Sequence, residues 1–235
     1  MRLEDILKSG APELGVPLSE NAVAGLRAYY ELLMRRNAEF NLTAIKGEED
    51  AARLHFLDCL GLISVCDLRN KRVADVGAGG GFPGWPVRIA EPSVDITLID
   101  STEKKVNFLR EVGEELGLEA SCIHARAEEL GQGEARESFD AVLSRAVARL
   151  NILSELCLPL VKPGGFFAAM KAEDSDLEIK EAENAIKLLG GAEPEIREYR
   201  IPGTEIIRRV LIIRKIKPTP LKYPRRYGAI KKAPL

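Results

Sequence analysis

The chain has 235 residues, 46% of them hydrophobic and 30% charged, and its formal net charge is −2. These values are those of a soluble globular protein that is long enough for one α/β domain plus an appendage. No apolar run reaches the roughly 18 residues that a transmembrane helix needs, and the start lacks the apolar core of a signal peptide, so we expect a cytoplasmic protein. With two histidines and four scattered cysteines, we expect free thiols and no metal site.

Residues 1–68 are predicted to form a helical extension before the main domain. Ser19 is suited to cap a helix that runs to about Glu39, because its hydroxyl can accept a hydrogen bond from a free N–H of the first turn. The segment 41–43 breaks this helix, and a second helix is predicted over residues 48–66.

Short apolar strands alternate with helices between residues 69 and 217. This alternation is typical of a doubly wound α/β domain with a mostly parallel sheet. We predict strands at residues 72–76, 95–100, 120–124, 139–143, 166–171 and 207–215, with a weaker seventh strand near 193–199.

The first predicted strand runs directly into a glycine-rich turn between Gly77 and Gly84. Glycines permit positive φ angles and leave no side chain between the backbone and a ligand. In an open α/β sheet the ligand lies past the carboxyl ends of the strands, beside a helix N-terminus. Asp100 ends the second strand, where a carboxylate can accept hydrogen bonds from both hydroxyls of a ribose. Together, the two features predict a cofactor that contains a nucleoside.

Two cofactor classes fit the glycine-rich turn. The segment GGGFPG (79–84) matches the dinucleotide fingerprint of oxidoreductases, whereas DVGAGGG (75–81) resembles the first motif of S-adenosylmethionine-dependent methyltransferases. Downstream, VKPGG (161–165) followed by an apolar strand is similar to the methyltransferase fold and is uncommon in dehydrogenases. The pattern favours a Rossmann-like class I methyltransferase, and a dinucleotide-binding oxidoreductase stays as the alternative.

Residues 214–235 contain eight lysines and arginines and no acidic residue. Four prolines in this segment predict an extended backbone that is not a regular helix. Basic side chains interleaved with Tyr223 and Tyr227 are suited to a phosphate backbone and to stacked bases. We predict that residues 218–235 form a tail on or near the active site that contacts nucleic acid; the alternative is a disordered, solubilising tail.

Motifs of a known family occur along nearly the whole chain, from about residue 20 to the end. They are NLTA (41–44), HFLD (55–58), DVGAGGGFPG (75–84), LIDS (98–101), KKVNFL (104–109), ARAEE (125–129), SRA (144–146) and YPRR (223–226). This combination resembles the glucose-inhibited division protein B family, whose members are bacterial 16S ribosomal RNA guanine-N7 methyltransferases. The chain departs from many members at Phe82, where Leu or Ile is common, and at Trp85, where a small aliphatic residue is usual.

The resemblance implies S-adenosylmethionine as the cofactor and assigns residues to it. They are Gly77, Gly79 and Phe82 for the methionine and ribose moieties, Asp100 and Ser101 for the ribose, Ala127 and Glu128 for the adenine, and Arg145 for the position beside the transferring methyl group.

The resemblance also implies the substrate, which is N7 of guanosine 527 in the 530 loop of 16S rRNA, in the small ribosomal subunit. In neutral guanine this nitrogen has a free lone pair, so the reaction needs no general base and depends on positioning. The candidate catalytic residues are Arg145, His55, Asp58 and Lys171, and the candidate RNA contacts are Arg126, Lys171, Tyr223, Arg225 and Arg226.

Structural alternatives exist for these residues. Arg145 is suited to a salt bridge at a strand end, His55 and Asp58 to a packed pair one helical turn apart, and Trp85 to the core behind the glycine-rich turn. For the function, the alternatives are a methyltransferase of the same fold that acts on a small molecule or a protein, and an RNA-binding ribosome-assembly factor. We expect a monomer.

Overall fold

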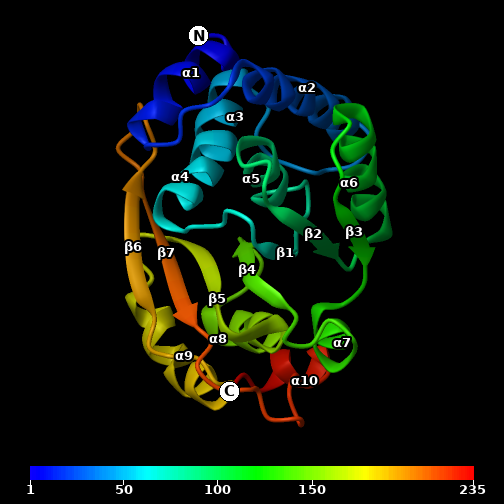
Figure 1. Cartoon of the computed structure of the whole chain (residues 1–235), viewed down its shortest axis with the longest axis vertical. Helices are drawn as coiled ribbons and strands as arrows, with labels where there is room; N and C mark the ends of the chain where they lie inside the picture. The colour runs from blue at the N-terminus through cyan, green and yellow to red at the C-terminus, as the bar shows by residue number, and fades with distance from the viewer.

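A seven-stranded sheet forms the centre of the protein (Figure 1). The computed structural model describes the whole chain, residues 1–235. The strands are β1 (Arg72–Val76), β2 (Asp95–Asp100), β3 (Ser121–His124), β4 (Phe139–Arg145), β5 (Val161–Ala172), β6 (Glu195–Arg200) and β7 (Ile207–Arg214), in the spatial order β3-β2-β1-β4-β5-β7-β6. The strands β1 to β5 pair in parallel, and β7 is antiparallel to both of its neighbours. The predicted mostly parallel, doubly wound sheet is confirmed, including the weaker strand near residues 193–199.

Strand β5 begins at Val161, earlier than predicted. Val161 pairs with Phe139, and the register then shifts before Ala141 pairs with Phe166. Gly164, with φ of +89°, lies in this irregular part of the strand. The segment 161–165 is therefore part of the ladder as a bulge, which accommodates extra residues on one strand without ending the pairing.

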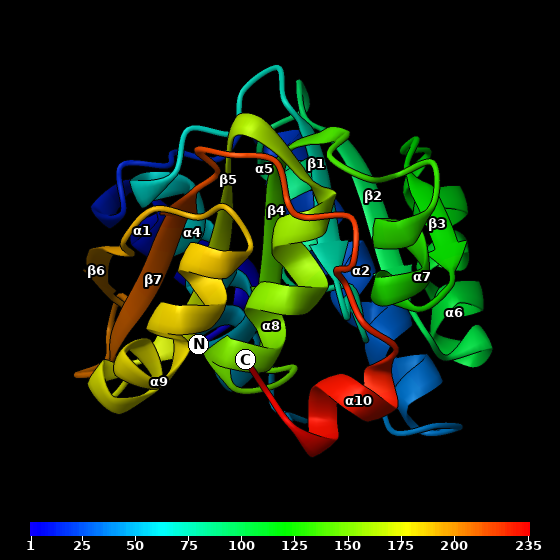
Figure 2. The same ribbon diagram turned by 90° about the horizontal axis from the view of Figure 1, so that it is seen from below.

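Helices cover both faces of the sheet (Figures 1 and 2). One face packs against α1 (Leu3–Glu13), α2 (Glu20–Asn37), α3 (Glu48–Ala51), the π-helical turn η1 (Ala52–Leu57), α4 (Asp58–Val65), α5 (Gly84–Ala90) and α6 (Glu103–Leu116). The other face packs against α7 (Ala127–Gln132), α8 (Leu150–Cys157), the 3-10 turn η2 (Leu158–Leu160), α9 (Asp176–Leu188) and α10 (Tyr227–Lys232). Successive side chains of β1 show the alternation, since Val73 joins the first core and Ala74 the second.

The N-terminal helices follow the sequence closely. The Ser19 hydroxyl accepts a hydrogen bond from the N–H of Ala22 at 3.1 Å, so the predicted N-cap is confirmed. The second predicted helix is continuous over residues 48–65. Its central turn, η1, is π-helical, which the sequence pattern did not indicate. Such turns recur at functional sites, and this one contains the buried His55.

The C-terminal tail is not extended throughout, in contrast to the prediction. Residues 227–232 form α10, and both Tyr223 and Ile230 are buried in the core of the second face. Pro224 and Pro234 bracket a proline-free stretch, and within it nothing prevents a short helix. The number of prolines predicted an extended segment, but their positions leave residues 227–232 free to form a helix.

Trp85 is fully buried and the four cysteines are free, as predicted. None of the helices combines the length and the apolar character needed to cross a lipid bilayer.

Candidate active site

The glycine-rich turn connects β1 to α5 and is tied to the neighbouring strand β2. The N–H groups of Gly77 and Ala78 both donate to the carbonyl of Ile99, at 2.9 and 3.0 Å. Gly77 has φ of +76°, and a Cβ at this position would lie 2.4 Å from Val147 Cγ2. Any other residue would therefore clash here as well as adopt an unfavourable backbone conformation.

A cleft of about 310 Å³ lies beside this turn, at the carboxyl ends of the strands. We call it the Asp100 cleft. Five of the residues predicted to bind the cofactor line it, together with Arg126: they are Gly77, Asp100, Ser101, Ala127 and Glu128. Further lining residues are Ala146, Val147, Leu156 and Tyr227.

The Asp100 carboxylate is buried and held by the backbone. Its Oδ1 accepts from the N–H of Thr102 at 2.8 Å, and its Oδ2 accepts from the N–H of Gly79 at 3.0 Å. Each carboxylate oxygen has a second lone pair, so the group is oriented and can still accept two hydrogen bonds from a diol. This oriented acceptor and the glycine cradle at Gly77 fit the ribose and the thioether end of a nucleoside cofactor.

Three residues predicted to contact the cofactor, Gly79, Phe82 and Arg145, do not line the Asp100 cleft. Gly79 holds Asp100 through its N–H. Phe82 is 5% exposed, and its ring stacks on His55 with the centroids 4.2 Å apart and the planes at 15°. Because the His55 imidazole covers its ring, Phe82 supports His55 and does not face the Asp100 cleft.

A second cleft, of about 470 Å³, lies on the other side of the end of β4. We call it the Arg145 cleft. It is lined by Ile45, Leu54, His55, Asp58, Arg145, Ala146, Met170, Lys171, Ala172 and Arg208. All four residues predicted to be catalytic are in this set, so the structure brings them together.

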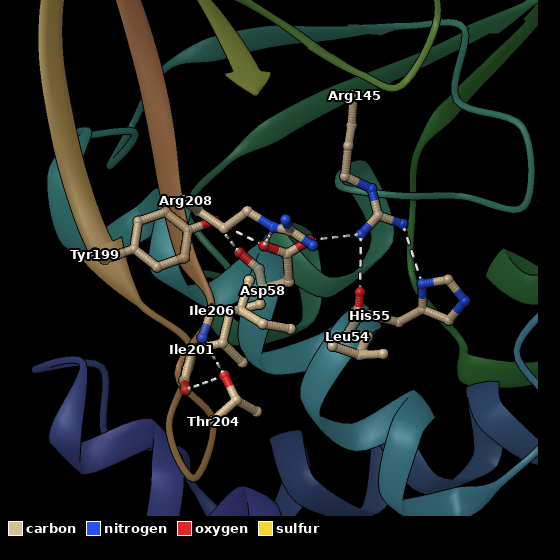
Figure 3. A network of polar contacts seen from close by, with 9 residues as sticks. All are labelled: Leu54, His55, Asp58, Arg145, Tyr199, Ile201, Thr204, Ile206 and Arg208. Atoms are coloured by element: carbon tan, nitrogen blue, oxygen red, sulfur yellow. Dashed lines mark hydrogen bonds and ion pairs between the residues drawn. The ribbon is translucent and has the colours of Figure 1, made fainter. Parts of the chain in front are cut away.

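Arg145 lies at the centre of a hydrogen-bonded network (Figure 3). Its Nη1 donates to Asp58 Oδ2 at 3.1 Å and to the carbonyl of Leu54 at 3.3 Å. Its Nη2 lies 3.2 Å from His55 Nδ1, and its guanidinium lies 4.9 Å from the ring centroid of Phe82. The side chain of Arg145 is 16% exposed, so the network fixes the position of a nearly buried cation.

Asp58 connects the helical extension to the far edge of the sheet. Its Oδ1 accepts from Arg208 Nε at 3.1 Å and from the Tyr199 hydroxyl at 3.0 Å. These two partners were not found from the sequence. A signal existed for Arg208: Val210 and Ile212 of the same strand belong to the core on the first face, and the two-residue period of a strand puts Arg208 on that face.

The imidazole of His55 has one tautomer. Arginine only donates hydrogen bonds, so Nδ1 accepts from Arg145 and the proton is on Nε2. That proton is donated to the Thr43 hydroxyl oxygen at 2.7 Å. Burial, and then the charge of Arg145, lower the pKa of His55 to about 3. His55 is therefore neutral, and both of its nitrogens are occupied, which leaves it without a free lone pair for proton abstraction.

Asp75, at the end of β1, is the buried acid behind the glycine-rich turn. Its Oδ2 accepts from the N–H of Gly84 at 2.8 Å, and its Oδ1 has no partner. Burial raises the pKa of Asp75 from 3.8 to about 7, against the lowering effect of the Gly84 hydrogen bond. Asp75 thus binds a proton in the folded state over a pH range where His55 has lost one.

The two groups are expected to give opposite pH dependences of stability. Between about pH 4 and 6.5, folding takes up a proton at Asp75 and releases one at His55, so their contributions cancel. Asp75→Asn should make stability rise with pH, relative to the parent chain, by up to about 1.4 kcal/mol per pH unit. His55→Asn should make it fall with pH by a similar amount. Urea unfolding at pH 4.5, 5.5 and 6.5 measures both slopes. The double variant, Asp75→Asn with His55→Asn, should show neither slope relative to the parent chain, and a slope that remains in it would contradict the cancellation.

The predicted RNA-contact residues fall into two groups. Arg126 and Arg226 are exposed. Lys171 lines the Arg145 cleft, and its Nζ donates to the carbonyl of Ala148 at 2.9 Å and to Glu178 at 2.6 Å. In contrast, Tyr223 is 6% exposed, and Arg225 is bonded to the fully buried Glu155. These two residues hold the tail on the domain, and their contact with RNA stays a prediction.

The two clefts meet at Ala146. This residue lines both of them and has a positive φ of +56°, which turns the chain sharply after β4. The preceding Ser144 is buried and donates to the carbonyl of Val76 at 3.0 Å, so the ends of β4 and β1 are held together. A group bound in the Asp100 cleft and a group bound in the Arg145 cleft would face each other across this point.

Comparison with known proteins identifies the family of the chain. The sequence model of the rRNA small subunit methyltransferase G family matches residues 22–207. The chain belongs to this family. It is 45% identical to ribosomal RNA small subunit methyltransferase G of Alkaliphilus metalliredigens over the full length of both chains. The identity is 42% to the protein of the same name from Bacillus velezensis, over 100% of this chain and 99% of the relative.

Solved structures with low sequence identity share the fold of this family member. The YcgJ protein from Bacillus subtilis covers 69% of this chain and is itself fully covered, with a TM-score of 0.52 and 16% identity. An S-adenosylmethionine-dependent methyltransferase from Aquifex aeolicus covers 74% of this chain, and 98% of it is covered, with a TM-score of 0.52 and 19% identity. The protein is thus a methyltransferase with a Rossmann-like class I fold, and a dinucleotide-dependent oxidoreductase is ruled out by its family.

Proposed function

We propose that the protein transfers a methyl group from S-adenosylmethionine to N7 of guanosine 527, in the 530 loop of 16S rRNA. The observation that carries this proposal is the junction of two clefts at Ala146. One cleft has the oriented carboxylate that suits a ribose, and the other has the cations that suit a nucleotide. The names of the relatives support ribosomal RNA of the small subunit as the substrate. We further propose that the protein acts in the cytoplasm as a monomer.

The Asp100 cleft would hold the cofactor, which supplies an electrophilic methyl group on a sulfonium sulfur. Asp100 would accept the ribose hydroxyls while its own orientation is kept by the N–H groups of Gly79 and Thr102. Glu128 is buried at the same cleft and offers a carboxylate to the exocyclic amine of adenine. The missing side chain at Gly77 leaves the backbone free to approach the sulfur.

The Arg145 cleft would hold the base and its phosphates. Three of its lining side chains, Arg145, Lys171 and Arg208, are cationic, and Asp58 is the one acid among them. A net positive cleft attracts the RNA backbone. Arg208 uses Nε for Asp58, so its terminal nitrogens are the donors best placed for guanine O6. A contact to O6 alone leaves the N7 lone pair free, whereas the common bidentate contact to O6 and N7 would block it.

The absence of an available base in the cleft suits this reaction. Both nitrogens of His55 are hydrogen-bonded, and Asp58 already accepts from three side chains. Methylation of N7 does not remove a proton, so the catalytic contribution of these residues is to hold the base in line with the methyl group. The base must leave its stack to enter the cleft, and the fixed guanidinium of Arg145 would orient it there.

Transfer of tritiated methyl groups to unmodified 16S rRNA tests this function. The RNA is offered both naked and in 30S particles, with a transcript that carries adenosine at position 527 as the matched control. Cleavage specific for N7-methylguanosine then locates the product. We expect one methyl group per RNA and one cleavage in the 530 loop. Incorporation that persists in the control transcript, or no incorporation in either form of RNA despite cofactor binding, would overturn the proposed target.

A further inference from the structure

The C-terminal segment Thr219–Leu235 is bound to the domain by polar contacts that determine its path. Arg136 Nη2 donates to the carbonyl of Thr219 at 2.6 Å, and Arg136 Nη1 donates to the carbonyl of Tyr223 at 2.8 Å. Gln132, at the end of α7, donates to the carbonyl of Pro224 at 2.6 Å. The segment therefore passes between α7 and α8 in one defined course (Figure 2).

A buried ion pair fixes the segment immediately before α10. Glu155 on α8 is fully buried and accepts from the backbone N–H and from Nε of Arg225, both at 2.8 Å. Its second oxygen accepts from Arg225 Nη2 at 2.6 Å. Breaking such a pair leaves a charge without a partner in the interior, which is strongly unfavourable. The position at which α10 begins is thus set by the α8 side chain that the tail covers.

The result of this path is that an aromatic ring from the tail lies at the Asp100 cleft. Tyr227 is the first residue of α10 and lines that cleft with Arg126, Ala127 and Glu128. The guanidinium of Arg126 lies 5.0 Å from the centroid of the Tyr227 ring, within the range of a cation–π contact. The buried side chain of Ile230, one turn later, holds the helix against the core.

We propose that α10 closes the adenine end of the cofactor cleft and that Tyr227, with Arg126 on its ring, is a stacking platform for the purine. This inference rests on the cofactor of the proposed function. Tyr227 lies beside residues 126–128, which follow β3. Ala146, where the Asp100 cleft meets the Arg145 cleft, follows a different strand, β4. Purines stack on tyrosine rings and on arginine guanidinium planes, and the pair offers both surfaces. The tail is then a part of the cofactor site.

Calorimetric binding of S-adenosylhomocysteine and of adenosine to the full chain tests this proposal. Tyr227→Ala is expected to raise the dissociation constants of both ligands about 10-fold, because it removes one base–aromatic stack. Tyr227→Phe keeps the ring and is expected to bind within about 2-fold of the parent chain. Lys232→Ala, an exposed substitution in the same helix, is the matched control and is expected to change neither constant. The thermal midpoint of each unliganded variant reports whether α10 stays folded.

The outcomes separate this inference from the proposed function. Unchanged affinity of Tyr227→Ala for both ligands, in a folded variant, would overturn the purine platform and leave the function standing. A loss for S-adenosylhomocysteine alone would also overturn it, because the ring would then contact the amino-acid end. An effect confined to the KM for RNA would assign Tyr227 to the substrate. Failure of the parent chain to bind S-adenosylhomocysteine would contradict the proposed cofactor itself.

Discussion

Arg145→Ala is expected to lower the rate of methyl transfer about 100-fold while leaving the affinity for S-adenosylhomocysteine within a few-fold of the parent value. The guanidinium is held by Asp58, Leu54 and His55 and lines the Arg145 cleft, where the base would bind. A reaction that depends on alignment loses a factor of this size when the acceptor is misplaced by about 1 Å. Single-turnover methylation and calorimetry measure the two quantities separately.

Two comparisons make this result specific. Arg145→Lys keeps the charge but replaces the planar guanidinium, whose two terminal nitrogens reach three groups, by a single compact ammonium, so we expect most of the rate loss to remain. Arg149→Ala removes an exposed arginine of the following loop, whose ion pair is with Glu181, and is expected to have little effect. Stability should fall by about 2 kcal/mol in Arg145→Ala, because Asp58 keeps Arg208 and Tyr199 as partners. Equal losses in rate and cofactor affinity would instead make Arg145 a cofactor ligand.

Asp100→Ala is expected to weaken binding of S-adenosylhomocysteine about 100-fold, through the loss of two hydrogen bonds to a charged acceptor. The carboxylate is prearranged by Gly79 and Thr102, so no ordering cost is expected when the ribose binds. Asp95→Ala, at the exposed start of the same strand, is the control. Calorimetry that finds the parent affinity in Asp100→Ala would remove the ribose from this position and with it the orientation proposed for the cofactor.

Much of the fold could be read from the sequence because its signals are local. The strands β1 and β2 are short apolar runs that end at a glycine turn and at Asp100, and each of these features is contained within a few residues. The Ser19 cap is equally local. Most of the residues assigned to the cofactor lie at the ends of these strands, and a parallel sheet brings such ends to one edge.

The parts that the sequence did not reveal depend on contacts between distant segments. Tyr199 and Arg208 reach Asp58 from strands about 150 residues later in the chain, and nothing near Asp58 indicates them. The tail gave a local signal for RNA binding, a cluster of basic and aromatic side chains. Its actual course depends on Glu155, a single buried acid on α8 that attracts Arg225. Phe82 was placed at the cofactor by resemblance, and its stacking on His55 results from the position of the helical extension.

A crystal structure of the protein with S-adenosylhomocysteine and an RNA fragment of the 530 loop tests most directly whether the two clefts divide cofactor and base between them. We expect the ribose hydroxyls at Asp100, the sulfur beside Gly77 and Ala146, and the guanine in the Arg145 cleft. The distance from the sulfur to guanine N7 should be about 5 Å, since the missing methyl group lies between them. A ribose away from Asp100, or a sulfur that faces away from the Arg145 cleft, would contradict this division.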